Sequence, residues 1–254
     1  MPRVIVITGA SEGIGALLAK QQGARGDSVV IGARRMDKLS AVAKESGRNA
    51  LAIEADVTKR ADVDRLRDAA LERFGHIDVW VNNAGRGIGI PVMDFSEEDL
   101  DEMIAVNLKS AWYGMKAVIP HFQERKRGHL INISSVLARV PLVSPRSAYS
   151  ASKAALNALA ANLRMDLRAN YPDIHVSVVM PGPVATEFHN NALGGTPGGR
   201  GIEMQSVEEV VKVIGDIIDR PVPEAYTNPS AAGLVQKYYR DVPGFEEELA
   251  ARVK

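Results

Sequence analysis

Short apolar segments rich in Val and Ile alternate along this chain with longer segments in which apolar residues recur every three or four positions. The first kind of pattern predicts strands that are buried on both faces, and the second predicts helices packed on one side. We expect strands at residues 4–8, 28–32, 50–55, 79–81, 130–133 and 176–179, and helices at residues 14–22, 36–45, 61–74, 96–123, 148–169 and 206–219. This order predicts an α/β fold in which a doubly wound parallel sheet carries helices on both faces.

Two of the expected helices begin with a capping sequence. Ser96 is followed three residues later by Asp99, and Ser206 is followed three residues later by Glu209. A serine that accepts a hydrogen bond from the third helical residue, with an acid there that reaches back, stabilises a helix start. These pairs fix where the two helices begin.

The alternation is interrupted at residues 185–205, which include a glycine-rich stretch at 194–201. Long irregular segments inside a compact domain are usually lids or inserts. Because this segment follows the sixth expected strand, we expect it to form a substrate lid at the carboxyl edge of the sheet. The chain shows no repeats and no linker rich in Pro, Ser or charge, so we expect one domain over residues 1–254.

Composition restricts the possible partners. The 31 basic side chains balance 31 acidic ones, so the chain has no broad field that would hold nucleic acid or an anionic membrane. It contains no cysteine, which excludes disulfides and thiolate chemistry. No apolar run approaches the roughly 20 residues of a membrane span, and no leader precedes the first strand. We expect a cytoplasmic protein that is intact from its first residue and binds neither nucleic acid nor membrane.

A glycine-rich turn lies between the first expected strand and the first expected helix. Gly9, Gly13 and Gly15 are spaced Gly-x-x-x-Gly-x-Gly. Glycines let the backbone approach a pyrophosphate, and the helix N-terminus supplies unpaired N–H groups. The alternative is a plain strand-to-helix turn, but the position at the first such junction of an alternating chain favours nucleotide binding.

The end of the second expected strand indicates which dinucleotide is bound. Arg34 and Arg35 stand where dinucleotide sites that select NAD(H) carry an acid for the ribose 2′-hydroxyl. A guanidinium can pair with the 2′-phosphate of NADP(H), whereas a carboxylate would repel it. The alternative is a pair of solvated arginines. We favour NADP(H) over NAD(H), although Glu12 places an anion inside the glycine turn.

Tyr149 and Lys153 are the candidate catalytic pair. They are four residues apart in an expected helix, so their side chains share one face. A phenol with an ordinary pKa near 10 exchanges protons poorly at neutral pH, and an adjacent ammonium lowers that pKa. Hydride transfer to a carbonyl also builds negative charge on oxygen, which Ser135, Tyr149 and Lys153 together could stabilise.

Five motifs occur in the order typical of one family: the glycine turn, Asn82-Asn83-Ala84-Gly85, Ser134-Ser135, Tyr149-x-x-x-Lys153 and Pro181-Gly182. The chain therefore resembles a compact short-chain dehydrogenase/reductase over about residues 4–190. The resemblance implies a single Rossmann-like domain with a seven-stranded parallel sheet, a nicotinamide cofactor, and hydride transfer between a carbonyl and an alcohol. It also implies a homodimer or homotetramer acting on a small molecule.

The resemblance also implies individual roles. Tyr149 would act as general acid and base, and Lys153 would lower its pKa and bind the nicotinamide ribose. Ser135 would hold the substrate oxygen, with Ser134 as the alternative. Asn107 matches an asparagine that anchors a water leading to Lys153, and its alternative role is to stabilise a helix kink. The cofactor would contact Gly9, Ser11, Gly13, Ile14, Gly15, Arg34, Arg35, Asp56, Val57, Asn83, Ala84, Gly85, Tyr149, Lys153, Pro181, Gly182 and Thr186.

Several neighbouring residues have competing interpretations. Asp56 matches an acid beside the adenine, but it could equally cap the next helix. Asn82 is expected to brace adjacent strands. The five histidines, His76, His121, His129, His175 and His189, show no metal-ligand spacing, so we expect packing or solvated residues and no metal site.

Substrate identity is open at this stage. The pocket walls would come from residues 86–92, 136–145 and 185–205, where Arg86, Arg139 and Arg146 could meet an anion but are more often solvated in such positions. The helix at 96–123 and the alanine-rich helix after Tyr149 are expected to form a dimer face. The functional alternatives are an NAD(H)-dependent enzyme of the same family and an NADP(H)-binding redox sensor without catalysis.

Overall fold

The computed structural model describes residues 2–141, 144–195 and 204–252 of the chain. Its centre is one parallel sheet with the strand order β3-β2-β1-β4-β5-β6-β7. The strands are β1 Val4–Thr8, β2 Ser28–Ala33, β3 Ala50–Glu54, β4 Val79–Asn82, β5 Gly128–Ile133, β6 Ile174–Met180 and β7 Glu224–Tyr226. The order reverses between β1 and β4, which creates the crevice where α/β folds of this kind bind ligands.

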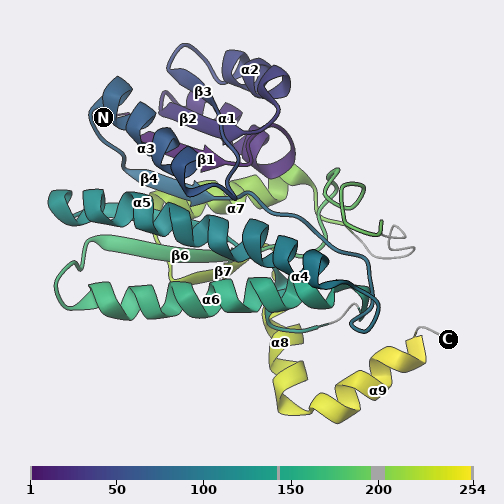
Figure 1. Ribbon diagram of the computed structural model, residues 1–254. Coiled ribbons are helices and arrows are strands. Elements are labelled where there is room, and N and C mark those ends of the chain that lie inside the picture. The colour runs from purple at the N-terminus through teal and green to yellow at the C-terminus, as the bar shows by residue number, and fades with distance from the viewer. Residues whose placement is uncertain (1, 142–143, 196–203, 253–254) are drawn as a thin grey trace.

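Helices cover both faces of the sheet (Figure 1). They are α1 Gly13–Ala24, α2 Met36–Glu45, α3 Arg60–Phe74, α4 Glu97–Ile104, α5 Ser110–Arg125, α6 Ser147–Arg168 and α7 Val207–Asp219, followed by α8 Ala231–Arg240 and α9 Val242–Arg252. Short helical turns are the π-helix η1 Ala105–Lys109 and the 3₁₀ turns η2 Val136–Ala138 and η3 Ser144–Arg146. The predicted doubly wound α/β class is confirmed.

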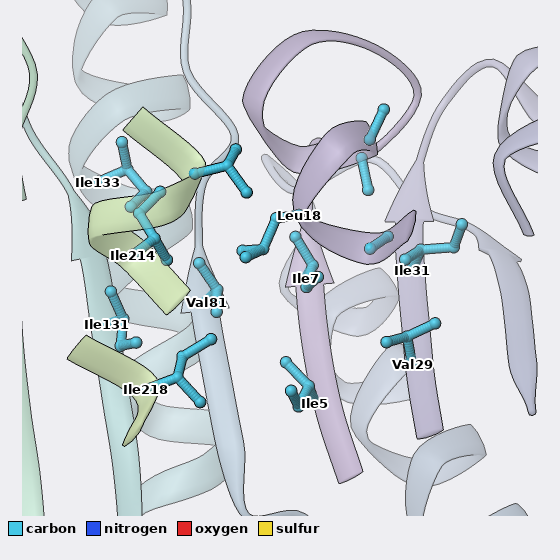
Figure 2. Close-up of a cluster of buried hydrophobic side chains, with 14 of the residues drawn as sticks. Ile5, Ile7, Leu18, Val29, Ile31, Val81, Ile131, Ile133, Ile214 and Ile218 are labelled. Atoms are coloured by element: carbon cyan, nitrogen blue, oxygen red, sulfur yellow. The ribbon is translucent and has the colours of Figure 1, made fainter. Parts of the chain in front are cut away.

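Alternation along the strands builds two hydrophobic cores. Ile5 and Ile7 of β1 face α1, α2 and α7, where they pack with Leu18 and Ile214 (Figure 2). Val6 faces the opposite side, in the core formed with α3, α5 and α6. Because all these side chains are fully excluded from solvent, the carboxyl ends of the central strands are fixed relative to one another.

Asn82 ties β4 to its neighbours. Its Nδ2 donates to Asn132 Oδ1 of β5 at 2.9 Å and to the carbonyl of Ala111 in α5 at 3.1 Å. Its Oδ1 accepts from Trp80 Nε1 at 2.8 Å. The prediction that Asn82 braces adjacent strands is confirmed.

The expected long helix at 96–123 is not a regular α-helix. It comprises α4, the π-helix η1 and α5. Asn107 lies in η1, and its side chain accepts from the Arg86 N–H at 3.0 Å and donates to the Arg86 carbonyl at 2.9 Å. π-Helical turns inside α-helices are frequent at functional sites. Both predicted capping boxes, at Ser96 and Ser206, are formed.

The C-terminal part was not predicted from periodicity. Strand β7 is three residues long, and α8 and α9 follow it as an arm at the bottom of the view in Figure 1. In the expected lid, residues 196–203 lie outside the described residues. The described remainder is irregular, with single bridges from Leu193 to Ile88 and from Gln205 to Val184. None of the described helices is long and apolar enough to cross a membrane.

Candidate active site

A cavity of about 1230 Å³ opens at the carboxyl ends of the central strands. It brings together residues from the turns after β1, β2, β3 and β4 with residues from the segments after β5 and β6. Of the expected site residues, its walls include Gly9, Ser11, Gly13, Ile14, Arg34, Arg35, Asp56, Val57, Asn83, Ala84, Gly85, Ser135, Tyr149, Lys153, Pro181, Gly182 and Thr186. Gly15 and Asn107 lie behind the wall. Segments far apart in the sequence therefore meet in one site.

The glycine turn is closely packed against the end of β4. Gly9 has φ +67°, and a Cβ there would lie 2.7 Å from Ala84 Cα. A Cβ on Gly15 would lie 2.5 Å from Asn83 Nδ2, which itself donates to the Thr8 carbonyl at 2.9 Å. Any larger residue at either glycine would displace the backbone.

The same turn fits a pyrophosphate. Helix α1 carries no acidic side chain in its first turn, and the acid that precedes it, Glu12, makes no capping hydrogen bond to the helix, so its N-terminal N–H groups are not occupied by that side chain. Gly13 has φ +59° and faces the methyl group of Thr186. The glycines thus form a cradle that a Cβ would fill, which is what close approach of a phosphate requires.

Asp56 does not cap the next helix, contrary to one of its two expected roles. Helix α3 begins at Arg60 with Lys59 in the capping position. The Asp56 carboxylate instead accepts from the N–H of Thr58 at 3.1 Å and from its hydroxyl at 2.7 Å, which closes a turn at the edge of the cavity.

Tyr149 and Lys153 lie one turn apart on α6, and both are buried at the cavity wall. The Lys153 ammonium lies 5.9 Å from the centre of the Tyr149 ring and donates to the Ile133 carbonyl at 2.8 Å. A Cβ on Gly85 would lie 3.4 Å from Lys153 Nζ and 3.1 Å from Asn107 Oδ1. The π-helix therefore brings Asn107 to the same side of Gly85 as the lysine.

Ser135, rather than Ser134, faces the phenol. The hydroxyl of Ser135 hydrogen-bonds to Tyr149 and also accepts from the Leu137 N–H at 3.1 Å. Ser134 turns away and donates to the Lys153 carbonyl at 3.4 Å. Ser135 is therefore the serine whose hydroxyl lies beside the phenol, and its role in holding the substrate oxygen stays a prediction.

Burial is the main influence on the pKa values of Tyr149 and Lys153. It raises the pKa of Tyr149, although the Ser135 hydrogen bond and the positive charge of Arg146 act to lower it. Burial also lowers the pKa of Lys153, to about 8. The sequence predicts that Lys153 lowers the pKa of Tyr149; in the structure, the influences that lower it come from Ser135 and Arg146, and desolvation outweighs them.

Arg146 is buried at the site, whereas the sequence favoured a solvated arginine at this position. Its side chain is 6% exposed, and Nη2 lies 3.0 Å from His189 Nδ1. The expected solvated state is therefore wrong for Arg146, and His189, which is partly buried, lines the cavity. By contrast, Arg86 pairs with Glu102, and Arg139 pairs with Glu224 at 2.6 Å.

Aromatic and C-terminal side chains complete the cavity. The Phe188 ring meets the Tyr149 ring edge-on, with centroids 5.6 Å apart. Leu234 of α8 and Phe245 and Leu249 of α9 also line the cavity, which the predicted pocket walls omitted. The signal in the sequence is the apolar pair Phe245 and Leu249 at helical spacing.

Within the described residues, no three His, Asp or Glu side chains gather as a potential metal site. His129 instead lies buried at the far end of β5, where it hydrogen-bonds to Ser177 at 2.8 Å.

Comparison with known proteins shows the family. Residues 3–194 match the family model for short chain dehydrogenases. The chain is 34% identical to an uncharacterised oxidoreductase of Staphylococcus epidermidis, over 72% of this chain and 79% of that protein. The chain belongs to the short-chain dehydrogenase/reductase family.

Solved structures agree in fold. An alcohol dehydrogenase from the archaeon Thermococcus sibiricus, complexed with 5-hydroxy-NADP, superposes with a TM-score of 0.78 at 30% identity, over 89% of this chain and 96% of its own. A short-chain dehydrogenase/reductase from Burkholderia phymatum, in complex with NAD, superposes with a TM-score of 0.87 at 24% identity, over 95% of this chain and 94% of its own. The protein is thus an oxidoreductase of this family, with the Rossmann-like fold that the resemblance implied.

Proposed function

We propose that the chain is an NADP(H)-dependent oxidoreductase that interconverts a carbonyl and a secondary alcohol, with Tyr149 as general acid and base. The observation that carries the proposal is the convergence of Ser135, Tyr149 and Lys153 on the cavity that also holds the glycine turn. Hydroxyl donors and a cation meet there beside a pyrophosphate cradle. A bound nicotinamide would supply or accept the hydride.

The chain's own groups divide the remaining work. Ser135 orients the substrate oxygen, and Tyr149 donates its proton to that oxygen during reduction and removes it during oxidation. Lys153 favours the phenolate as the site becomes charged. Asn107 positions Gly85 and the surroundings of Lys153 through its two bonds to the Arg86 backbone.

NADP(H) is favoured over NAD(H) because Arg34 and Arg35 follow β2 at the edge of the cavity. A dinucleotide with a 2′-phosphate would meet two guanidinium groups there. The alternative, NAD(H), is favoured by one observation: Arg35 pairs with Glu12 at 2.7 Å. Direct binding measurements with both dinucleotides separate the two.

A panel of small carbonyl and alcohol compounds, followed by NADPH absorbance, tests the activity. Turnover of at least one compound that is lost in Tyr149→Phe supports the proposal. Tight NADPH binding without oxidation by any compound of a broad panel would instead indicate a redox sensor.

We also propose that the protein acts in the cytoplasm as a homodimer or homotetramer. Trp112 of α5 and Leu159 and Met165 of α6 are large apolar side chains exposed on these helices, as a helix-to-helix contact between subunits requires. Sedimentation at micromolar concentration tests this, and a monomer would contradict it.

A further inference from the structure

Glu12 occupies an unexpected position in the glycine turn. It precedes α1 with extended backbone angles, and its side chain makes no capping hydrogen bond to that helix. The carboxylate instead reaches across to the start of α2, the segment that follows Arg34 and Arg35. An acid therefore lies between the phosphate cradle and the basic residues expected to bind the 2′-phosphate.

The carboxylate holds two cations. Its Oε1 lies 2.7 Å from Arg35 Nη2, and its Oε2 lies 3.3 Å from Lys38 Nζ. Arg35 Nη2 also donates to the Ser11 hydroxyl at 3.0 Å. The hydrogen bond from Arg35 is the main influence that lowers the pKa of Glu12, so the side chain is anionic at neutral pH.

A third contact fixes the carboxylate from the other side of the cavity. Asn191, in the segment after β6, donates from Nδ2 to Glu12 Oε1 at 3.2 Å. The backbone carbonyl of Asn191 in turn accepts from Arg86 Nε at 3.2 Å. Glu12 is thus held in place between α2 and the segment after β6, and the positive charge of Arg35 and Lys38 is directed at it.

We propose that Glu12 determines cofactor specificity by competing with the 2′-phosphate of NADP(H) for Arg35 and Lys38. This inference rests on the proposed function, because it requires a dinucleotide in the cavity. A 2′-phosphate is an anion, as the carboxylate is, and it binds the same donors. It must therefore displace Glu12 from Arg35 and Lys38, and it then lies close to a second negative charge. NAD(H) presents a neutral hydroxyl there and leaves the Glu12 pairs intact.

The competition reduces the preference for NADP(H) below the level that the basic residues alone would give. Removing the carboxylate charge therefore strengthens binding of NADP(H) selectively. It frees two cations for the phosphate and removes a like charge from its surroundings.

Calorimetric titration of the cofactor-free protein with NADP⁺ and with NAD⁺ tests this. Glu12→Gln is expected to lower the dissociation constant for NADP⁺ by about tenfold, the effect of losing one nearby like charge in a partly hydrated site, and to change that for NAD⁺ less than about twofold. Glu45→Gln is the matched control, since Glu45 pairs with Lys20 at 2.7 Å between α1 and α2 but does not line the cavity. It should change neither constant.

A second variant checks the cause and does not depend on Glu12→Gln alone. In an Arg35→Met background, Glu12→Gln should improve the free energy of NADP⁺ binding by less than about half of its effect in the unaltered protein. The reason is that Arg35, the main cation that Glu12 would release, is missing there. Equal gains for NADP⁺ and NAD⁺, no gain for NADP⁺, or a gain that persists in full without Arg35 would each overturn the inference. If the unaltered protein binds neither dinucleotide, the proposed function fails and this inference fails with it; if it binds NADP⁺ and Glu12→Gln has no effect, only this inference fails.

Discussion

The ammonium of Lys153 lies 5.9 Å from the centre of the Tyr149 ring, one turn along α6, and neither side chain is more than 8% exposed. Burial makes the ionised form of each group unfavourable, so it raises the pKa of the phenol and lowers that of the ammonium, the latter to about 8. The pair is therefore sensitive to any added charge, since a desolvated site screens charges weakly.

Replacing Lys153 should shift the pH dependence of alcohol oxidation. Oxidation requires the Tyr149 phenolate, and Lys153→Met removes a cation that favours it, so the acidic limb of the kcat/KM profile should move to higher pH. We expect a loss of about 10²-fold or more in kcat/KM near pH 7. Lys153→Arg is the matched variant that keeps the charge.

The result is read from the complete pH profile rather than from one rate. A profile that keeps its acidic limb in Lys153→Met, with rates uniformly reduced, would mean that the lysine has a structural role alone. Lys153→Arg should retain a limb closer to that of the unaltered protein.

Arg34 provides a test of cofactor choice. Arg34→Asp removes one of the two guanidinium groups after β2 and places a carboxylate where the 2′-phosphate would lie. Binding of NADP(H) should weaken by about 10²-fold, while binding of NAD(H) changes much less, because only the former carries the phosphate. Titration with both dinucleotides checks this, and equal losses would contradict the assignment.

Asn82 provides a test of stability. Asn82→Ala leaves Trp80 Nε1, the Asn132 amide and the Ala111 carbonyl without their present partner inside the protein. We expect the free energy of unfolding to fall by about 2–4 kcal/mol, because buried polar groups left unpaired keep their full desolvation cost. Denaturant titration measures the change, and a loss below about 1 kcal/mol would show that the network contributes little.

His129 should make the fold sensitive to acid. Its Nε2 must donate to Ser177, since the Ser177 hydroxyl donates to the Val222 carbonyl at 2.6 Å, and its Nδ1 has no hydrogen-bond partner among the described residues. Burial is the main cause that lowers the pKa of His129 to about 3, with a smaller contribution from His175.

The direction of the effect follows from proton linkage. In the unfolded chain His129 binds a proton near pH 6.5, whereas in the folded chain it does so only near pH 3. The contribution of neutral His129 to stability is therefore fully present above pH 6.5 and is lost as the pH falls from 6.5 towards 3. The contribution is at most about 5 kcal/mol. His129→Gln should be less stable than the unaltered protein at pH 7.5, and the difference should shrink by pH 4.5. His175→Gln, at an exposed position, should keep most of the slope; a constant difference for His129→Gln would contradict the prediction.

The sequence was most informative where local chemistry and periodicity agree. The alternation of Ile5, Val6 and Ile7 in β1 predicts a strand buried on both faces, and Ser96 and Ser206 mark helix starts to the residue. The helical spacing of Tyr149 and Lys153 likewise places both side chains on one wall of the cavity.

What could not be predicted depends on tertiary contacts. Asn107 in the π-helix bonds to the Arg86 backbone, a partner 21 residues away that no local pattern indicates. Strand β7 is too short to show a pattern. Arg146 is charged and near a loop, so its burial beside Tyr149 has no local signal; it depends on His189 and the segment after β6.

The most direct test of the account is the turnover of Tyr149→Phe. This variant keeps the ring and its contact with Phe188 but removes the hydroxyl that would exchange the proton. We expect kcat to fall by about 10³-fold or more at pH 7, while the dissociation constant for NADPH changes less than about threefold. Turnover within tenfold of the unaltered protein, on a compound that the protein converts, would contradict the assignment of Tyr149 as the acid and base.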